Sequence, residues 1–304
     1  MRKLKFDMTV NSAALLCANP EEFYSTAYIN ETTSDNFRVL PNVKAETKLS
    51  NVVFGQVLQA EQCAFNAPTD TLDAVTISVC GLSAMAQICQ FDIEASFLSA
   101  QMAQGSNGNF EVASFMNYYW SEMASYVQSD IETIRWQGDT TGTQPVVLCD
   151  GYEKLLGAYT DVVDVTAPTN VDSTNVLSFI QDMYEAAPTA VLSQGIDLRF
   201  YISRNVATAY CYAVAAGNTQ AYLTESLAMT YLGIPMVICD GMSDDKAVFT
   251  NKNNLIYAFD AEGDSTALKT INLNETTAEP YLRTRANMKI GFAIVNPSEI
   301  VYGS

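Results

Sequence analysis

Residues 233–260 read GIPMVICDGMSDDKAVFTNKNNLIYAFD. Three short apolar runs in this stretch, MVIC, AVF and LIYAF, are separated by the polar steps DGMSDD and TNKNN. Apolar runs of this length, bounded by turn-forming residues, predict β-strands joined by tight turns. The stretch contains no glycine-rich phosphate loop, no paired metal ligands and no nucleophile beside a base. It therefore predicts a stiff β-meander with a structural role near the end of the chain.

Before this meander, the strongest helical pattern lies in residues 110–137, FEVASFMNYYWSEMASYVQSDIETIRWQ. Its apolar residues recur with a period of 3.6 and form one stripe. The stripe consists of Val112, Phe115, Met116, Tyr119, Trp120, Met123, Val127, Ile131 and Ile134. Asn109 is a candidate cap and Gly138 a stop signal. At 1.5 Å per residue the helix would be about 40 Å long, which suits either a spine across an extended subunit or an ordinary core helix.

The segment 36–91 is rich in β-forming residues. Val75, Ile77 and Val79 alternate with polar residues, which predicts a half-buried strand. The run NVVFGQVLQ supplies a partner strand, and APTD breaks the chain between the two. A two-stranded excursion buries little surface by itself, so we expect it to lie against something else.

The rest of the chain mixes both kinds of element. We expect helices at 149–160, 173–188 and 204–217, with Ser173 or Thr174 capping the second. We expect strands at 197–203, 268–274, 281–295 and 298–303. The order is a β excursion, a long helix, a mixed block and a β finish. This order predicts an α+β fold and not a regular βαβ alternation.

Composition narrows the possible functions. Charged residues make up 16% of the 304 residues, below the usual level of about 25%. Uncharged polar surface costs less free energy to bury than charged surface. The low share of charged residues therefore favours a protein that buries much of its surface against partner chains over a monomer with an unusual surface. The net charge of −18 disfavours binding to phosphate backbones, although an acidic wall could enclose nucleic acid without adhering to it. No apolar run approaches the length of about 18 residues needed for a membrane helix.

The chain has no histidine. Catalytic triads of the usual kind therefore cannot be built here, and the commonest metal ligand is missing. An enzyme would have to rely on carboxylates, lysine or tyrosine. The seven cysteines show no CxxC spacing, so neither a zinc site nor a disulfide framework is favoured. Most of them lie in apolar runs, which predicts buried, reduced thiols.

Two acidic clusters are the best candidates for a ligand-binding site in this sequence. They are Asp260, Glu262 and Asp264 in one turn, and Asp240, Asp244 and Asp245 in another. The first lacks the glycine and the terminal glutamate of an EF-hand loop, and aspartates in turns commonly bond to their own backbone. Both clusters are therefore interpreted as turns, and Lys44 and Lys48 on the excursion as solvated side chains. No catalytic, cofactor-binding or metal-binding residue is predicted.

Five motifs occur in a fixed order: the excursion, a long helix ending in IRWQGDT, the turn-helix DGYEKLL, the stretch YLGIPMVICDGMSDDKAVFTNKNNLIYAFD, and TRANMKIGFAIVNPSEIVY. Their succession resembles the major capsid proteins of tailed bacteriophages, which have the Hong Kong 97-type fold. The resemblance covers most of the chain. Some members of that family form Lys–Asn crosslinks, but no lysine here matches that chemistry.

The resemblance implies an N-terminal arm at 1–35 and an extended hairpin loop at 36–91 that overlaps a neighbouring subunit. It also implies a peripheral domain formed by 92–149 and 263–304, which contains the spine helix, and an axial domain at 150–262. Hexamers and pentamers of such subunits form an icosahedral shell around double-stranded DNA, with portal, scaffolding or decoration proteins as further partners. The protein would then be part of a virion assembled in the bacterial cytoplasm.

Three alternatives remain open. An encapsulin-like nanocompartment would share the fold and enclose a cargo enzyme. A carboxylate-dependent enzyme such as a glycosidase would need two carboxyl groups about 5–9.5 Å apart in a cleft, and no stretch nominates such a pair. Another virion or adhesive binding protein would not close into shells.

Overall fold

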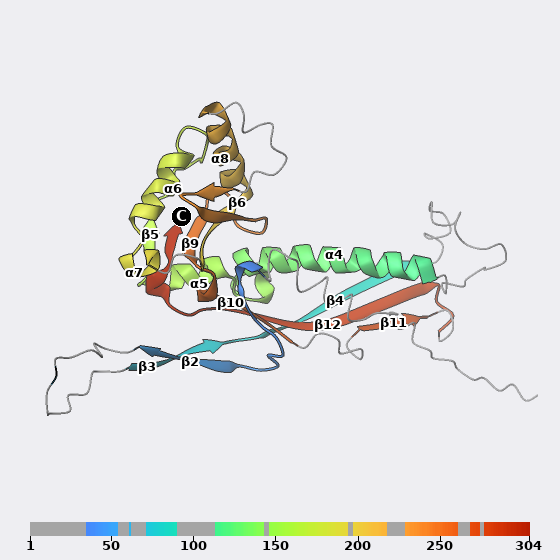
Figure 1. Ribbon diagram of the computed structural model, residues 1–304. Coiled ribbons are helices and arrows are strands. Elements are labelled where there is room, and N and C mark those ends of the chain that lie inside the picture. The colour runs from blue at the N-terminus through green and yellow to red at the C-terminus, as the bar shows by residue number, and fades with distance from the viewer. Residues whose placement is uncertain are drawn as a thin grey trace, which may run out of the picture. The chain divides into compact units, whose positions relative to one another are not determined.

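The computed structural model describes residues 35–53, 61, 71–89, 113–142, 146–193, 197–217, 229–260, 268–273 and 277–304 (Figure 1). The described residues fall into two compact units. Unit 1 contains residues 81–89, 113–127, 268–273 and 277–288, and unit 2 contains the other described residues. Helix α4 (Ala113–Gln137) and strand β12 (Tyr281–Ile294) pass from one unit into the other.

Unit 1 is a helix packed on a sheet. Strand β12 pairs with β4 (Cys80–Cys89) and, antiparallel, with β11 (Leu268–Asn272). In the part of β12 that belongs to unit 1, every second residue is buried, and these residues are Leu282, Thr284, Ala286 and Met288. Trp120 of α4 donates from Nε1 to Oγ1 of Thr270 at 3.2 Å, and the Thr270 and Thr284 hydroxyls lie 3.0 Å apart. The helix therefore covers the face of the sheet that carries Thr270 and Thr284, and the opposite face stays exposed.

Unit 2 contains a six-stranded sheet in the order β5-β13-β9-β6-β8-β7. The bounds are β5 Val163–Val165, β13 Val301–Gly303, β9 Ala247–Asn251, β6 Leu198–Ser203, β8 Ile234–Cys239 and β7 Thr230–Tyr231. In a separate group of strands, β10 (Leu255–Phe259) runs antiparallel to β12 and parallel to β1 (Arg38–Leu40). The helices are α5 Tyr152–Ala158, α6 Val176–Glu185, α7 Thr189–Leu192 and α8 Arg204–Gly217. Short 3-10 helices occupy Val146–Leu148, Lys252–Asn254 and Pro297–Glu299.

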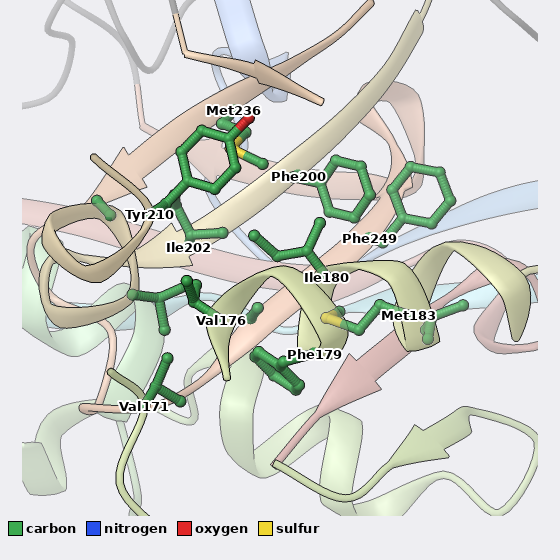
Figure 2. Packing of buried hydrophobic residues seen from close by; sticks show 14 of the residues in the cluster. Val171, Val176, Phe179, Ile180, Met183, Phe200, Ile202, Tyr210, Met236 and Phe249 are labelled. Carbon is green, nitrogen blue, oxygen red and sulfur yellow. The ribbon is translucent and has the colours of Figure 1, made fainter. Parts of the chain in front are cut away.

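The main core of unit 2 lies between this six-stranded sheet and the helices α6 and α8 (Figure 2). The apolar residues of α6 recur at Val176, Phe179, Ile180 and Met183, which places all four on one side of the helix. The rings of Phe200 and Phe249, on adjacent strands, stack with their centroids 4.2 Å apart. Residues of α6 and of β6 thus bury one continuous apolar layer, which is the physical reason why these segments form a helix and a strand.

The excursion forms a two-stranded antiparallel ribbon. Strands β2 (Thr47–Val53) and β3 (Thr71–Ile77) pair from Thr47 opposite Ile77 to Val53 opposite Thr71. At its root, Ile77 is fully buried and packs in one cluster with Val43, Ile256, Ala258 and Ala293. The prediction of two paired strands in the excursion is confirmed, but β2 begins at Thr47, before the predicted run 51–59, and residues 54–59 of that run lie outside the described residues. The root of the ribbon packs against the core of unit 2.

The three runs in the opening stretch are strands β8, β9 and β10, as predicted, but they do not form a meander. Strand β6 lies between β8 and β9, parallel to the first and antiparallel to the second, and β10 belongs to another group of strands. The order of strands along the chain therefore differs from their order in space. Periodicity reports which residues are buried, but it does not report which strand is the neighbour.

The cap predicted for the helix at 173–188 is also wrong. Helix α6 begins at Val176 with Asn175 at the cap position, and no side chain bonds there as a cap. The carboxylate of Asp172 instead accepts hydrogen bonds from the backbone of Thr174 and Asn175. These bonds form a turn before the helix, and aspartate favours such turns over helix interiors.

One pair of cysteines contradicts the prediction of reduced thiols. Cys80 and Cys149, which are separated by 69 positions in the sequence, form a disulfide with Sγ atoms 2.07 Å apart. Cys239 is a free, buried thiol as expected, and Cys211 is free and exposed. Sequence spacing did not predict the disulfide because the fold alone brings the start of β4 beside the segment that follows α4.

Reducing this disulfide should lower the free energy of unfolding by about 2–4 kcal/mol, because the cross-link restricts a long loop in the unfolded chain. Urea unfolding with and without a thiol reductant measures the effect. The matched controls are Cys149→Ser, which should not respond to reductant, and Cys211→Ser, which should respond as the wild type does. An unchanged midpoint for the reduced wild-type protein would contradict the assignment.

Candidate assembly framework

Three motifs singled out in the sequence meet in unit 2. They are IRWQGDT at the end of α4, CDGYEKLL around α5, and DGMSDDK between β8 and β9. The first two meet at Gly138 and Gly151, where the Gly151 amide donates to the Gly138 carbonyl at 2.8 Å. A Cβ atom on Gly138 would lie 2.3 Å from the carbonyl oxygen of Cys149, and one on Gly151 would lie 2.5 Å from that of Ile134. Only glycine allows the two backbones to approach so closely.

Gly151→Ala should therefore destabilise the protein by about 2–4 kcal/mol, because the new methyl group would overlap backbone atoms that cannot rotate away. Gly157→Ala is the matched control, since a Cβ at that position of α5 meets nothing within 4 Å. It should raise stability by about 0.5–1 kcal/mol through helix propensity. Urea unfolding of both variants measures the contrast, and equal effects would contradict the close approach at Gly151.

The third motif docks on the other two. Gly241 lies against α4 so closely that a Cβ would fall 2.1 Å from the carbonyl oxygen of Glu132, and Gln137 donates to the Gly241 carbonyl at 2.9 Å. The Glu153 carboxylate of α5 accepts from the Ser243 amide and hydroxyl at 2.8 Å each, and from Lys246 Nζ at 2.9 Å. The turn DGMSDDK is thus held by a helix backbone on one side and by a carboxylate on the other.

The aspartates of this turn also hold other segments. Asp245, which has a positive φ of 61°, accepts from the Val171 amide at 2.9 Å and from the Asn205 side chain at 2.6 Å. Asp240 forms an ion pair with Arg204 at 2.6 Å. The expectation that these aspartates bond to their own backbone is therefore wrong for Asp245, which instead ties the turn to α8 and to the segment before α6.

The end of α4 carries a buried cation. Arg135 is only 3% exposed, forms an ion pair with Glu132, and lies over the rings of Tyr257 at 4.7 Å and Phe37 at 5.2 Å. Burial tends to lower the pKa of Arg135, but the charge of Glu132 raises it above its usual value. Burial raises the pKa of Tyr257 to about 12, although Arg135 opposes this shift. Both effects keep the arginine charged and the tyrosine neutral.

Around this cation the aromatic rings form a connected cluster. Phe37 and Tyr152 stack at 6.0 Å, Trp136 meets Tyr152 edge-on at 5.3 Å, and Tyr152 meets Phe292 edge-on at 5.4 Å. Tyr152 donates from its hydroxyl to the Ile256 carbonyl at 2.7 Å. The cluster therefore joins the residue before β1 to α4, α5 and β12 within unit 2, and the hydrogen bond of Tyr152 adds β10.

A network of ion pairs at the surface joins the two ends of the loop that follows α4. Lys154 forms ion pairs with Asp139 and Asp150, each at 2.7 Å. The hydrogen bond from Lys154 is the main reason why the pKa of Asp139 is lowered to about 2. The network stays ionised at all but strongly acidic pH and links the two ends of the loop 139–150.

Together, these polar groups connect segments and do not surround a reaction centre. Among the residues that the structure describes, no group of three or more His, Cys, Asp or Glu side chains is placed to hold a metal ion. Of the acidic cluster considered for calcium, Glu262 and Asp264 lie outside the described residues. Lys44 and Lys48 are exposed, and the Lys44 carbonyl accepts a hydrogen bond from Lys289 at 2.7 Å. No helix in the described part of the chain is long and apolar enough to span a membrane.

Arg135 and Glu153 have roles that were not predicted from the sequence. Arg135 lies four residues after Ile131, on the buried stripe of α4, and Glu132 precedes it by three residues. A charged residue on a buried stripe with an opposite charge three residues away is a signal for a buried ion pair. Glu153 carries no such signal, because its partners Ser243 and Lys246 lie 90 and 93 residues away.

Solved structures with the same fold come from capsids. A chain of the satellite phage P4 procapsid, in a structure that includes the size determination (Sid) protein, aligns with a TM-score of 0.57 and 10% identity over 92% of this chain and 96% of that chain. The capsid of a native GTA particle gives 0.56 and 15% over 90% of both chains. The cyanophage A-1(L) capsid gives 0.56 and 9% over 91% and 93%.

These alignments show the fold, which is the Hong Kong 97-type capsid fold, and they confirm the predicted α+β class. No family model matches the sequence. No curated protein matches it either.

Proposed function

We propose that the protein is the major capsid protein of a tailed bacteriophage and that it assembles as hexamers and pentamers into an icosahedral shell around double-stranded DNA. The observation that carries this proposal is the likeness in fold to phage and GTA capsid chains over about 90% of the length of both chains. Because the likeness covers nine tenths or more of each chain, the proposal does not rest on a shared subdomain. The protein would act as structural material of a virion and not as an enzyme.

Each part of the chain has a role in this proposal. Residues 1–35 are an arm, and 36–91 contain the extended loop that overlaps a neighbouring subunit. Residues 92–149 and 263–304 form the peripheral domain with its spine helix, and 150–262 form the axial domain. Portal, scaffolding or decoration proteins would be the further partners. The ribbon β2–β3, whose root packs on the core, has the form that an overlapping loop needs.

The internal connections of unit 2 support a mechanical role. A subunit of a closed shell must keep its shape under load from its neighbours, and rigid junctions serve that purpose. The junction of Gly138 with Gly151, the Glu153 network and Arg135, which lies over the rings of Phe37 and Tyr257, each join different segments of unit 2. A low share of charged residues suits extensive burial between subunits.

The contents of the particles test the proposal against an encapsulin-like compartment. The chain is expressed in bacteria with a candidate scaffold and portal from the same genome, and sedimenting particles are treated with nuclease and then opened. Protected double-stranded DNA, present only when the packaging proteins are supplied, supports the phage capsid. A single co-purifying enzyme with no DNA would support the nanocompartment, and soluble monomers under every condition would contradict both.

A further inference from the structure

The exposed face of the sheet in unit 1 carries three positively charged side chains. Arg283 and Arg285 on β12 point away from α4, and Lys269 on β11 is exposed beside them. Between these cations lie polar and apolar side chains, of which Met85 is 72% exposed and Ile271 is 47% exposed. We call this set the cationic sheet face: Ser83, Met85, Gln87, Lys269, Ile271, Arg283, Arg285 and Asn287.

The pairing register places like charges directly opposite each other. Lys269 is the cross-strand partner of Arg285, and Arg283 follows two residues along on the same face. Like charges directly opposite in an antiparallel pair destabilise a sheet. Among the described residues, Arg283 has an ion pair with Glu279 at 3.9 Å, whereas Lys269 and Arg285 have no ion pair. The isolated subunit therefore carries a repulsion that its own described residues do not offset.

The arginines are also held in place. Arg285 Nε donates to the Ser83 hydroxyl and to the Asn287 side chain, each at 3.1 Å, and Arg283 Nε donates to the Gln87 side chain at 2.7 Å. These bonds use the inner nitrogens and orient the guanidinium groups over the strands, which leaves outward donors for an anionic partner. Arg285 is thus oriented and has no ion pair among the described residues, which is typical of a cation at a docking surface.

Charge is strongly segregated along the chain, and this identifies the partner. No lysine or arginine occurs from Leu49 to Ile134, although the whole chain has 16. The acidic residues of that cation-free segment are Glu61, Asp70, Asp73, Asp92, Glu94, Glu111, Glu122, Asp130 and Glu132. Of these, Glu61, Glu122 and Asp130 are described and exposed. Any second copy of the chain thus offers acidic surface to a face that needs anions.

We propose that the cationic sheet face is a contact between subunits and that it receives acidic side chains from the cation-free segment, 49–134, of a second copy. The inference rests on the proposed function and adds the surface and the chemistry of one contact. Subunits with a net charge of −18 repel one another. A local contact between opposite charges would fix how two subunits align, which two uniformly acidic surfaces could not do. Double-stranded DNA is the competing anion, and the large negative net charge argues against it.

The test compares two double variants with the same loss of charge. Lys269→Gln with Arg285→Gln removes the facing cations, whereas Lys44→Gln with Lys252→Gln removes two cations of unit 2, of which Lys44 is exposed and Lys252 forms an ion pair with Asp197. Purified subunits are followed by sedimentation velocity over a range of concentrations at about 0.1 M and about 1 M salt, which differ in Debye length about threefold. Thermal unfolding of the isolated subunits and binding to a random DNA duplex are measured in parallel.

The first variant should need about tenfold more subunit to form particles at low salt. Its isolated subunit should unfold at the same temperature as the wild type or higher, because the cross-strand repulsion is relieved. High salt should weaken assembly of the wild type more than that of this variant, and the second variant should behave as the wild type does. A combined loss of assembly and of subunit stability would instead assign the cations a structural role.

Two further outcomes overturn the inference alone. One is assembly of the first variant at the wild-type concentration. The other is loss of duplex binding with unchanged assembly, which would make the face a nucleic-acid surface. Absence of particles from the wild-type chain under every condition would contradict the proposed function itself, and the inference with it.

Discussion

Deletion of residues 50–70 should leave a folded subunit that forms no stable shells. The deletion removes most of β2 and the segment up to Asp70, but it keeps Leu49, Val75 and Ile77, which pack at the root of the ribbon. The core of unit 2 therefore survives, while the part of the loop proposed to reach a neighbouring subunit is lost. Circular dichroism and thermal unfolding measure folding, and sedimentation velocity measures assembly.

The stability of the deletion variant is the internal control for this experiment. We expect its unfolding temperature to stay near that of the wild type, because the removed ribbon buries little surface of its own. Assembly should fall below detection at concentrations where the wild type forms particles. Normal shells from the variant would contradict the proposed overlap, and an unfolded variant would show that the ribbon belongs to the core.

Glu132→Gln should lower the free energy of unfolding by about 3 kcal/mol, because it leaves the buried charge of Arg135 without its carboxylate. Arg135 lies among Phe37, Trp136, Tyr152 and Tyr257, where few groups can hydrate a cation. Arg135→Met combined with Glu132→Gln should recover most of that loss, since methionine fills a similar volume in an apolar site. Urea unfolding of the two single variants and the double variant completes the cycle.

The size of the coupling is the informative quantity in this cycle. If the ion pair exists as described, the double variant is more stable than the Glu132→Gln variant, although it carries one more substitution. Arg135→Met alone should cost less than Glu132→Gln alone, because the Glu132 side chain is 21% exposed and can be hydrated. Purely additive effects would contradict a buried, coupled pair.

Periodicity predicted the individual elements of this fold well. The stripe at Tyr119, Trp120, Met123 and Ile131 is buried in α4, and the alternation at Val75 and Ile77 marks β3. These patterns succeed because they depend only on which side of one element faces the core. Asn109, Val112, Phe115 and Met116, which belong to the same prediction, lie outside the described side chains.

Long-range contacts were beyond the reach of pattern analysis. Nothing in the order of β8 and β9 indicates that β6 lies between them, and no spacing links Cys80 to Cys149. Both depend on chain segments that meet only in the folded protein. The acidic turn DGMSDDK illustrates the same limit, because its letters indicate a solvated turn whereas its contacts with Gln137 and Glu153 fix it to α4 and α5.

The candidate framework could be located from the sequence but not explained. The motifs IRWQGDT, DGYEKLL and DGMSDDK stand out as landmarks, and all three meet in unit 2. Their glycines are needed where two backbones touch, at distances that only the structure provides. The charged residues of β12 alternate with uncharged ones, as they do in any half-exposed strand. Only the pairing register shows that Lys269 of β11 lies opposite Arg285.

Electron microscopy of the purified, recombinantly expressed protein tests the central claim most directly. The proposed function predicts closed shells or isolated capsomer rings, with subunits in sixes and fives, either from the chain alone or once a scaffold is co-expressed. Particles of uniform size with icosahedral symmetry would establish the shell-forming role. Folded monomers or small oligomers at all concentrations, with and without a scaffold, would contradict it.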